Sequence, residues 1–341
     1  MCAYSEVLSG YMLSPMESDD TREQYLKVRT PKALRPGSMN FPQNFPKWNT
    51  SLMKAYYGNN ATKENDFGYH YLPKRDGQYD ILANFERMAQ GQVNGLICQG
   101  FNPLAALPNK NKLGKALANL KYMVVIDPLK TESAEFWKNF GEMNNAKPED
   151  IKTEVIRLPS TCFAEDPGTF TSSGRVIQWH WAAGDAPGEA KTDREITGTL
   201  FTKIRDLYKK EGGKGREPLM AVKWDYSSGT NPPAEEVTKE ISGRALVDIK
   251  DPKTGAVLFK AGEQLPGFGV LRDDGTTECG NWIYGGCWSQ VGNLTARRNN
   301  ADEGGMGNHL SWGYSWPANR RVLYNRAGAD PSGKAWDPKR P

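Results

Sequence analysis

From residue 79 onward the chain alternates amphipathic segments with short runs of continuous apolar residues. Apolar side chains recur at helical spacing over three segments, 79–91, 109–120 and 132–140. Unbroken apolar runs predict three strands, at 93–98, 121–126 and 154–158. Strands without polar alternation are typical of parallel sheets that helices cover on both faces. The pattern therefore predicts an α/β fold built on an open, mostly parallel sheet flanked by helices.

Further elements are expected beyond this sheet. A strand over 175–181 precedes a long helix over 192–210, for which Thr192 or Asp193 can act as the N-cap. Residues 219–224 are interpreted as one more strand. These elements extend the α/β pattern to about residue 240.

Beyond residue 240 the sequence changes to β and loop character. An Asp-Pro-Lys-Thr-Gly turn at 251–255 predicts a hairpin between the segments 244–249 and 256–259. The tail after Cys279 is dense in Gly, Asn, Trp and Arg and shows little periodicity. The pattern therefore predicts hairpin and irregular extensions on the α/β domain.

Three regions follow from these changes of pattern. Residues 1–75 form an irregular peripheral segment with a short helix near 51–57, expected to wrap a neighbouring domain. Residues 76–240 form the α/β domain, and residues 241–341 form a hairpin and loop-rich extension.

Composition and charge exclude several classes of function. The 341 residues are 38% hydrophobic and 25% charged, with a formal net charge of +4 and charges of both signs interspersed. That balance argues against nucleic acid as a partner. No run approaches the roughly 20 apolar residues of a membrane-spanning helix, and the first residues lack the basic and apolar regions of a signal peptide.

Cysteine and histidine usage argues against a metal centre within this chain. The spacing of the cysteines matches neither a zinc nor an iron–sulfur site, which predicts free thiols at Cys2, Cys98, Cys162, Cys279 and Cys287. The three histidines form no paired motif, and no GxSxG nucleophile motif occurs. We therefore expect neither a catalytic residue nor a metal ligand here.

Polar residues and glycine follow the predicted strands, at the edge where open parallel sheets bind ligands. Gly100 and Asn102 follow the first strand, and Asp127 ends the second. Gly100 permits close approach of the backbone, and a carboxylate at position 127 can accept two hydrogen bonds from a guanine edge or bind a ribose diol. No GxGxxG or P-loop motif is present, so the residues indicate only a nucleotide-binding-like domain.

Further acceptors follow the third strand and begin the long helix. Glu165 and Asp166 lie in the loop after the third strand, and Asp193 lies at the helix start. Structural roles are open for most of these residues, because Asn102 and Asp127 precede prolines as turn residues do, and Asp193 suits an N-cap. His180, between two tryptophans, is interpreted as a packed or rim histidine.

For two pairs of arginines, both a binding role and a structural role are open. Arg297-Arg298 and Arg320-Arg321 have the charge to face phosphates or an acidic partner, but solvated or ion-paired roles are more common for arginine.

Several motifs in order resemble one known family. The stretches VNGLICQGFNPLAALPNKNKLGKALANLKYMVVIDPLKTESAEFW and RLPSTCFAEDPGTFTSSGRVIQWHWAAGDAPGEAKTD are similar to the dinucleotide-binding domain of molybdopterin oxidoreductases. The segments SLMKAYYGNNATKEN, LRDDGTTECGNWIYGGCW and WPANRRVLYNRAGADPSGKAWDPKRP resemble the respiratory formate dehydrogenase major (α) subunit. The resemblance extends over nearly the whole chain.

The resemblance implies a cofactor and assigns residues to it. The cofactor is a bis-molybdopterin guanine dinucleotide carrying molybdenum or tungsten. By position, Gly100 and Asn102 match the first cofactor loop, and Ile126 with Asp127 match the strand end that reads guanine.

Three more positions match loops that reach the same dinucleotide, namely Glu165, Asp166 and Asp193. The family's usual asparagine in a following loop is replaced by Ser172-Ser173, which removes one contact. The resemblance also implies that the 4Fe-4S cluster, the active selenocysteine or cysteine and the capping domain lie outside these residues, so that this is an internal fragment.

The implied parent enzyme oxidises formate to CO₂. It would pass electrons through iron–sulfur clusters to an iron–sulfur β subunit and a membrane cytochrome b γ subunit, at a periplasmic, membrane-associated location. Two alternatives remain: a non-catalytic α/β binding or assembly module, and a related molybdenum oxidoreductase with another substrate.

Overall fold

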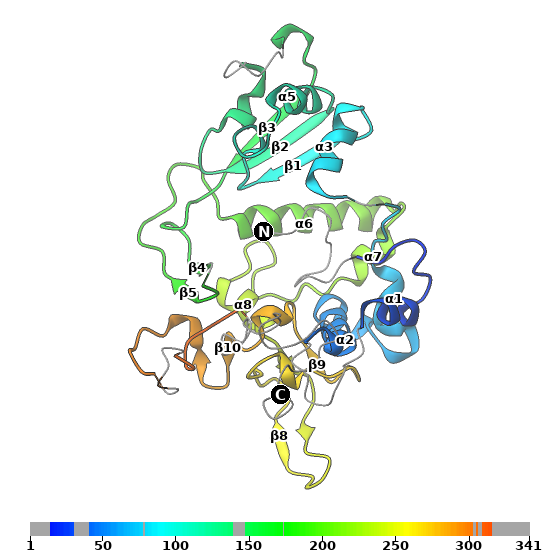
Figure 1. The fold of residues 1–341 in the computed structure, drawn as a ribbon, viewed down its shortest axis with the longest axis vertical. Coiled ribbons are helices and arrows are strands. Elements are labelled where there is room, and N and C mark those ends of the chain that lie inside the picture. Colours follow the sequence, from blue (N-terminus) through cyan, green and yellow to red (C-terminus); the bar gives the residue numbers. More distant parts are fainter. Residues whose placement is uncertain are drawn as a thin grey trace, which may run out of the picture.

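The computed structural model describes residues 14–30, 41–77, 79–138, 147–172, 174–302, 305 and 309–315. The small parallel sheet and its helices form one end of the molecule, α6 (Asp193–Glu211) crosses the middle, and helices with short hairpins form the other end (Figure 1). No helix within the described ranges is long and apolar enough to cross a membrane.

The other helices and strands are short. The remaining helices are α1 (Arg22–Arg29), α2 (Phe45–Tyr57), α3 (Ile81–Ala89), α4 (Pro103–Ala106), α5 (Lys110–Ala118), α7 (Arg216–Ala221) and α8 (Ala234–Ser242). The strands are β1 (Gly95–Gln99), β2 (Tyr122–Asp127), β3 (Glu154–Pro159), β4 (Gly168–Thr171), β5 (Ile177–His180), β6 (Arg244–Ala245), β7 (Ile249–Lys250), β8 (Val257–Phe259), β9 (Thr277–Glu278), β10 (Trp288–Ser289) and β11 (Gly292–Asn293). Turns of 3-10 helix include Lys63–Tyr71, Glu132–Lys138 and Trp282–Tyr284.

The predicted parallel sheet is confirmed. β1, β2 and β3 lie in that order and pair in parallel, so that Gln99, Ile126 and Leu158 stand side by side. All three strands therefore end at one edge, and the loops that follow them begin there.

Helices cover one face of this sheet. Cys98, Met123 and Val125 are buried in one cluster with Leu113 and Leu117 of α5, whose predicted apolar stripe is confirmed. The residues alternating with them point the other way, and Ile97 is 61% exposed, with Tyr122 and Ile156 also exposed. Within the described residues, the prediction of cover on both faces is therefore wrong.

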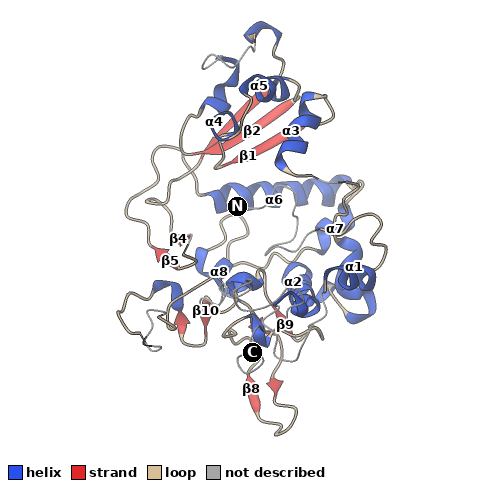
Figure 2. Ribbon diagram, in the orientation of Figure 1, coloured by secondary structure: helices blue, strands red, loops and turns tan. Residues whose placement is uncertain are grey.

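The long helix α6 explains the difference. It packs its apolar residues away from the open sheet face: Phe201 lies 4.3 Å from Trp224, and Gly198 lies against Thr230. Figure 2 shows α6 running beside the edge of β1 rather than over the sheet. An unbroken apolar run indicates a strand that is apolar on both faces, but it does not identify the element that packs on each face.

Other predicted elements are corrected by the structure. Residues 219–224 are not a strand, because α7 extends to Ala221 and the good helix formers Leu219 and Met220 lie within it. The segment near 132–140 forms a 3-10 turn over its described part rather than a helix. Leu82, one of the apolar residues that predicted the helix within 79–91, is exposed.

The strand predicted over 175–181 is β5, but it pairs antiparallel with β4 in a separate ribbon. The hairpin predicted after residue 240 is confirmed as β7 and β8, whereas β6 pairs with β9. The predicted helix near 51–57 is confirmed and begins earlier, at Phe45, because proline is tolerated in a first turn.

A second core lies at the other end of the molecule. Trp48 of α2 stacks on Trp282 with ring centroids 3.5 Å apart, and Phe268 meets both rings edge-on. Residues from 41–72 thus share one buried cluster with residues from 245–283. The division at residues 75 and 240 stays a prediction, but these two outer regions pack together.

A buried carboxylate links this second region to Lys223, which follows α7. Glu278 is 1% exposed, and both of its carboxylate oxygens accept from Lys223 Nζ at 3.1 Å, while Arg244 Nε donates at 2.5 Å. Glu240 of α8 lies near them. Burial raises the pKa of Glu240, the charge of Lys223 opposes this rise, and Glu278 adds to it.

The pH dependence of stability tests this burial. Because the pKa of Glu240 is higher in the folded chain than in the unfolded one, its ionised form destabilises the fold above the folded pKa. Glu240→Gln should therefore raise the free energy of unfolding at pH 8, by about 1.4 kcal/mol for each unit of pKa elevation. The gain should vanish as the pH falls below the unfolded value of 4.5.

Glu235→Gln is the matched control, because Glu235 lies exposed on the same helix. Denaturant melts from pH 4 to 8 measure the effect. A gain that is equal at all pH values, or one shared by the control, would contradict it.

Candidate functional site

The carboxyl edge of the sheet joins the first two predicted loops. Gly100 follows β1, and its N–H donates to the carbonyl of Ile126 at 2.9 Å. Its φ of +57° is a left-handed conformation that favours glycine, and a Cβ there would meet nothing within 4 Å. The backbone at Gly100 is therefore open to close approach by a ligand.

Asp127 ends β2 beside this open backbone. Its Oδ1 accepts the N–H of Leu129 at 2.8 Å, which closes the turn that the following proline suggested. The part of the chain that the structure describes supplies no hydrogen-bond partner to Oδ2. Ile126 has its side chain buried and its carbonyl bonded to Gly100, so it supports the edge from behind.

Asn102 holds the first loop to the next one. Its Nδ2 donates to Glu132 at 2.5 Å, and its Oδ1 accepts from Ser133 Oγ at 2.6 Å. The buried Ser133 hydroxyl also accepts the N–H of Leu104 at 3.0 Å. Asn102 thus fixes the shape of the loop around Gly100.

The start of α6 meets the same edge. Thr192 is the N-cap and accepts the N–H of Glu195 at 3.0 Å, so the capping role suggested for Asp193 is wrong. Asp193 instead accepts Gln99 Nε2 at 3.0 Å through one carboxylate oxygen. Lys191 pairs with Ser160 after β3, which brings the Pro-Gly-Glu-Ala segment back to the sheet.

Arg194 ties the acidic loop to this helix. Its guanidinium binds both carboxylate oxygens of Asp166, at 2.7 and 2.9 Å, and also donates to the carbonyls of Pro167 and Pro232, each at 3.0 Å. A fork of this shape is the strongest geometry for an arginine–carboxylate pair. Both acceptor atoms of Asp166 are therefore engaged by Arg194.

Glu165 turns its carboxylate to its own loop, since Oε2 accepts the N–H of Cys162 at 2.8 Å. The structure thus brings Gly100, Ile126 and Asp127 together at the sheet edge. Asp193 is linked to this edge by its hydrogen bond with Gln99. Asp166 is paired with Arg194. Arg194 and Gln99 were missed by sequence reasoning. The sequence offered one signal for Arg194: Glu165 and Asp166 have no basic residue close to them along the chain, so a partner from a distant segment was to be expected.

Other candidates have structural roles. Arg298 donates to the carbonyls of Thr295, Arg297 and Trp179, which confirms a structural role rather than a free cation. Arg320-Arg321, Cys2 and Ser173 lie outside the described residues. His180 is packed against Phe170, as expected for a packed or rim histidine.

The cysteines are free thiols wherever the structure describes them. Burial raises the pKa of Cys98 to about 11, and its Sγ donates to the carbonyl of Phe101 at 2.8 Å. No group of potential metal ligands occurs in the described ranges.

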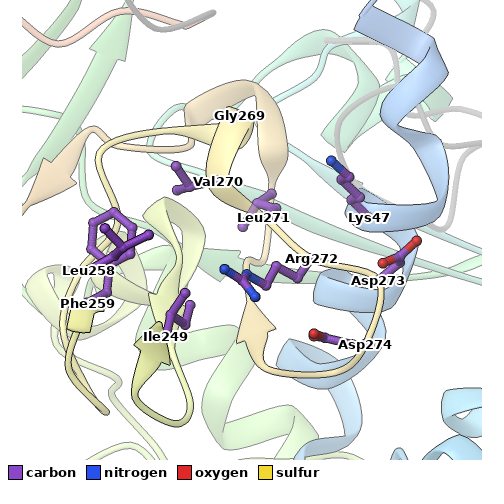
Figure 3. A pocket seen from close by; sticks show the side chains of 10 residues that line it. All are labelled: Lys47, Ile249, Leu258, Phe259, Gly269, Val270, Leu271, Arg272, Asp273 and Asp274. Atoms are coloured by element: carbon purple, nitrogen blue, oxygen red, sulfur yellow. The ribbon is translucent and has the colours of Figure 1, made fainter. Parts of the chain in front are cut away.

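A shallow cavity of about 400 Å³ lies away from the sheet. Lys47 of α2, Ile249, Leu258 and Phe259 of the β7–β8 hairpin and the segment 269–274 line it (Figure 3). None of the predicted site residues contributes to its lining. The cavity and the predicted ligand-binding residues therefore lie in different parts of the structure. The accessible carboxylate of Asp127 and the open backbone at Gly100 favour the sheet edge as the candidate binding site.

Known proteins match nearly the whole chain. The chain is 52% identical over 336 residues to the formate dehydrogenase-O major subunit of Escherichia coli, covering 98% of this chain and 33% of that protein. It is 37% identical to the formate dehydrogenase 2 subunit alpha (cytochrome c-553) of Nitratidesulfovibrio vulgaris, over 98% of this chain and 32% of that protein. The chain spans about a third of the length of these relatives.

A more distant similarity covers less of the chain. The assimilatory nitrate reductase catalytic subunit of Bacillus subtilis is 30% identical over 146 residues, which is 42% of this chain and 17% of that protein. No family model matches. The resemblance inferred from the motifs is confirmed by the 52% identity.

Replacing the arginine fork tests the link between loop and helix. Arg194→Lys keeps the charge but cannot bind both oxygens of Asp166 and two carbonyls at once. We expect the free energy of unfolding to fall by about 1–2 kcal/mol and amide exchange over 162–168 to quicken.

Arg205→Lys is the control, because Arg205 on the same helix donates to one carbonyl, that of Met220. Hydrogen exchange read by mass spectrometry, with denaturant melts, measures both effects. Unchanged exchange over 162–168 in the Arg194 variant would show that the fork does not hold this loop.

Proposed function

We propose that this chain, a homologue of one third of the formate dehydrogenase major subunit, forms one dinucleotide-binding wall of a molybdopterin formate dehydrogenase. The observation that carries the proposal is the 50–52% identity to three such subunits over 98% of the chain. Two features of the sheet edge support it: the open glycine backbone and the Asp127 Oδ2, which no residue in the described ranges engages.

The residues at this edge fit a guanine dinucleotide. A guanine presents N1–H and an exocyclic amine side by side, and a carboxylate can accept from both. Asp127 Oδ2 is available for this contact, Oδ1 keeps a second lone pair beside the N–H of Leu129, and Gly100 leaves room for the ligand beside its backbone. Asp193 keeps its second carboxylate oxygen for a sugar hydroxyl or the base.

The other proposed site residues shape this edge. Asn102 holds the first loop through Glu132 and Ser133, and Ile126 backs Gly100. Asp166 acts through Arg194, which positions the loop that also carries Glu165. These contacts give the ligand a preorganised surface, which limits the ordering that binding requires.

The bis-molybdopterin guanine dinucleotide, with molybdenum or tungsten, supplies the two-electron chemistry when it is bound. Formate oxidation to CO₂ then belongs to the whole subunit, and this chain contributes binding and scaffold rather than catalytic groups. A 4Fe-4S cluster, an iron–sulfur β subunit and a membrane cytochrome b γ subunit complete the proposed electron path, at a periplasmic, membrane-associated location.

Nucleotide binding by the chain tests the proposal. Asp127→Asn replaces an acceptor by a donor, so the affinity for GDP should fall about tenfold, in line with the loss of one bidentate contact. ADP should bind weakly to both proteins, because adenine lacks the matching donors. Isothermal titration calorimetry measures each affinity.

Asp150→Asn is the matched control, because Asp150 lies exposed before β3, at the opposite edge of the sheet. Equal affinity for GDP and ADP, or the same loss in the Asp150 variant, would count against a guanine site at Asp127.

A further inference from the structure

The open face of the parallel sheet follows from the topology. The chain steps from β1 to β2 and from β2 to β3 in the same direction, so right-handed connections place both crossovers on one face. Leu117 of the first crossover and Phe136 of the second are buried in one cluster with Met123 of β2. The opposite face can therefore be covered only by a segment from outside these crossovers.

That open face is apolar across all three strands. Ile97, Val124 and Ile156 stand side by side in the register and alternate with the buried residues. Tyr122 lies one row nearer the amino ends of the strands, and its ring reaches across β1, since a Cβ at Gly95 would lie 2.2 Å from it. Exposed apolar groups of this extent mark a surface that another element covers.

The helix α6 meets the sheet at one end of this face. Asp193, its first residue, accepts Gln99 Nε2 at 3.0 Å, and Gln99 lies on the same face of β1 as Ile97. Just before the helix, the N–H of Lys191 donates to the carbonyl of Pro159 at 3.2 Å. Figure 2 shows α6 running from this end alongside β1. An interface between α6 and the sheet therefore exists already, and the open face continues it.

A stripe of apolar side chains on α6 lies on the side that carries Asp193. At 100° per residue, Leu200, Ile204 and Leu207 lie within about 40° of Asp193 around the helix axis. Ile204 is 45% and Leu207 54% exposed, and none of the three belongs to either buried cluster of the described residues. This stripe is distinct from Phe201, which lies about 80° from Asp193.

The two apolar surfaces match in position. Tyr122 stands in register four residues back along β1 from Gln99, which is about 13 Å. Leu200 and Ile204 are seven and eleven residues beyond Asp193, about 10 and 16 Å along α6. Measured from the bond between strand and helix, the tyrosine ring therefore falls between the two helix residues.

We propose that the open face of the sheet is the docking surface of α6, and that the chain closes about the contact between Gln99 and Asp193. Closing brings Leu200 and Ile204 onto Tyr122 and removes apolar surface from water, which favours the closed form. It also holds the carboxylate of Asp193 at the carboxyl edge of the sheet. The inference concerns the fold of the chain and does not depend on which ligand that edge binds.

Thiol labelling of the full chain measures closure. Ile204→Cys is the reporter, and Val28→Cys, at an exposed position of α1, is the reference for an open site. If the chain is closed about nine-tenths of the time, maleimide should modify the reporter about tenfold more slowly than the reference. Peptide mass spectrometry separates both thiols from the natural cysteines.

Variants on the sheet identify what covers the helix. Ile97→Asn places an amide in the closed contact, where burial without a partner is unfavourable, so labelling at position 204 should quicken toward the reference rate. Tyr122→Ser should do the same, and circular dichroism verifies that each variant folds. Val257→Asn is the matched control, because Val257 is a similarly exposed strand residue on β8, and it should leave labelling slow.

The proposal requires protection at position 204 that is independent of protein concentration and is relieved by the two sheet variants. Equal labelling of the reporter and the reference would show that the face stays open, and would overturn it. Protection that disappears on dilution would assign the stripe to a contact with a second copy of the chain. Protection that neither sheet variant relieves would assign it to another segment, and either of these two results also overturns the proposal.

Discussion

One guanidinium sets the geometry on which the candidate site depends. Arg194 binds both oxygens of Asp166 and the carbonyls of Pro167 and Pro232, so three separate segments meet at the first turn of α6. The pair is about four-fifths buried, which weakens solvent screening and strengthens each contact. The backbone N–H of Thr161 also donates to the carbonyl of Lys191, at 3.0 Å, so Arg194 adds a side-chain link to a loop whose start the backbone already holds near α6.

The same helix also reaches the sheet itself. Asp193 accepts from Gln99, so the two neighbouring residues Asp193 and Arg194 bind opposite sides of the site. The second core is organised separately, by Trp48 on Trp282 and by the buried carboxylate of Glu278. The sheet and the second core thus lie on either side of α6, and the predicted site residues Gly100 and Asp127 belong to the sheet (Figure 1).

The local features of this fold follow from sequence, and the long-range ones do not. Leu113 and Leu117 predicted their helix because spacing alone places them on one buried stripe, whereas Leu120, also assigned to that helix, is buried just beyond its end. Asp127 was placed at a strand end because the apolar run stops there. Pairing is harder, since Arg194 and Asp166 are 28 residues apart and meet only because the chain returns to the sheet after β3. Trp48 and Trp282 are in contact although most of the chain lies between them in sequence, and no local sequence pattern predicts such a contact.

A nucleotide bound to this chain would contact either the sheet edge, as proposed, or the cavity near Lys47. Hydrogen exchange of the chain, with and without a guanine dinucleotide, locates the contact by which amides become protected. Binding at the sheet edge should slow exchange over 99–102 and 127–129, where Gly100 and Asp127 lie. Protection over 269–274, the segment that lines the cavity, with no change at the sheet edge, would contradict it.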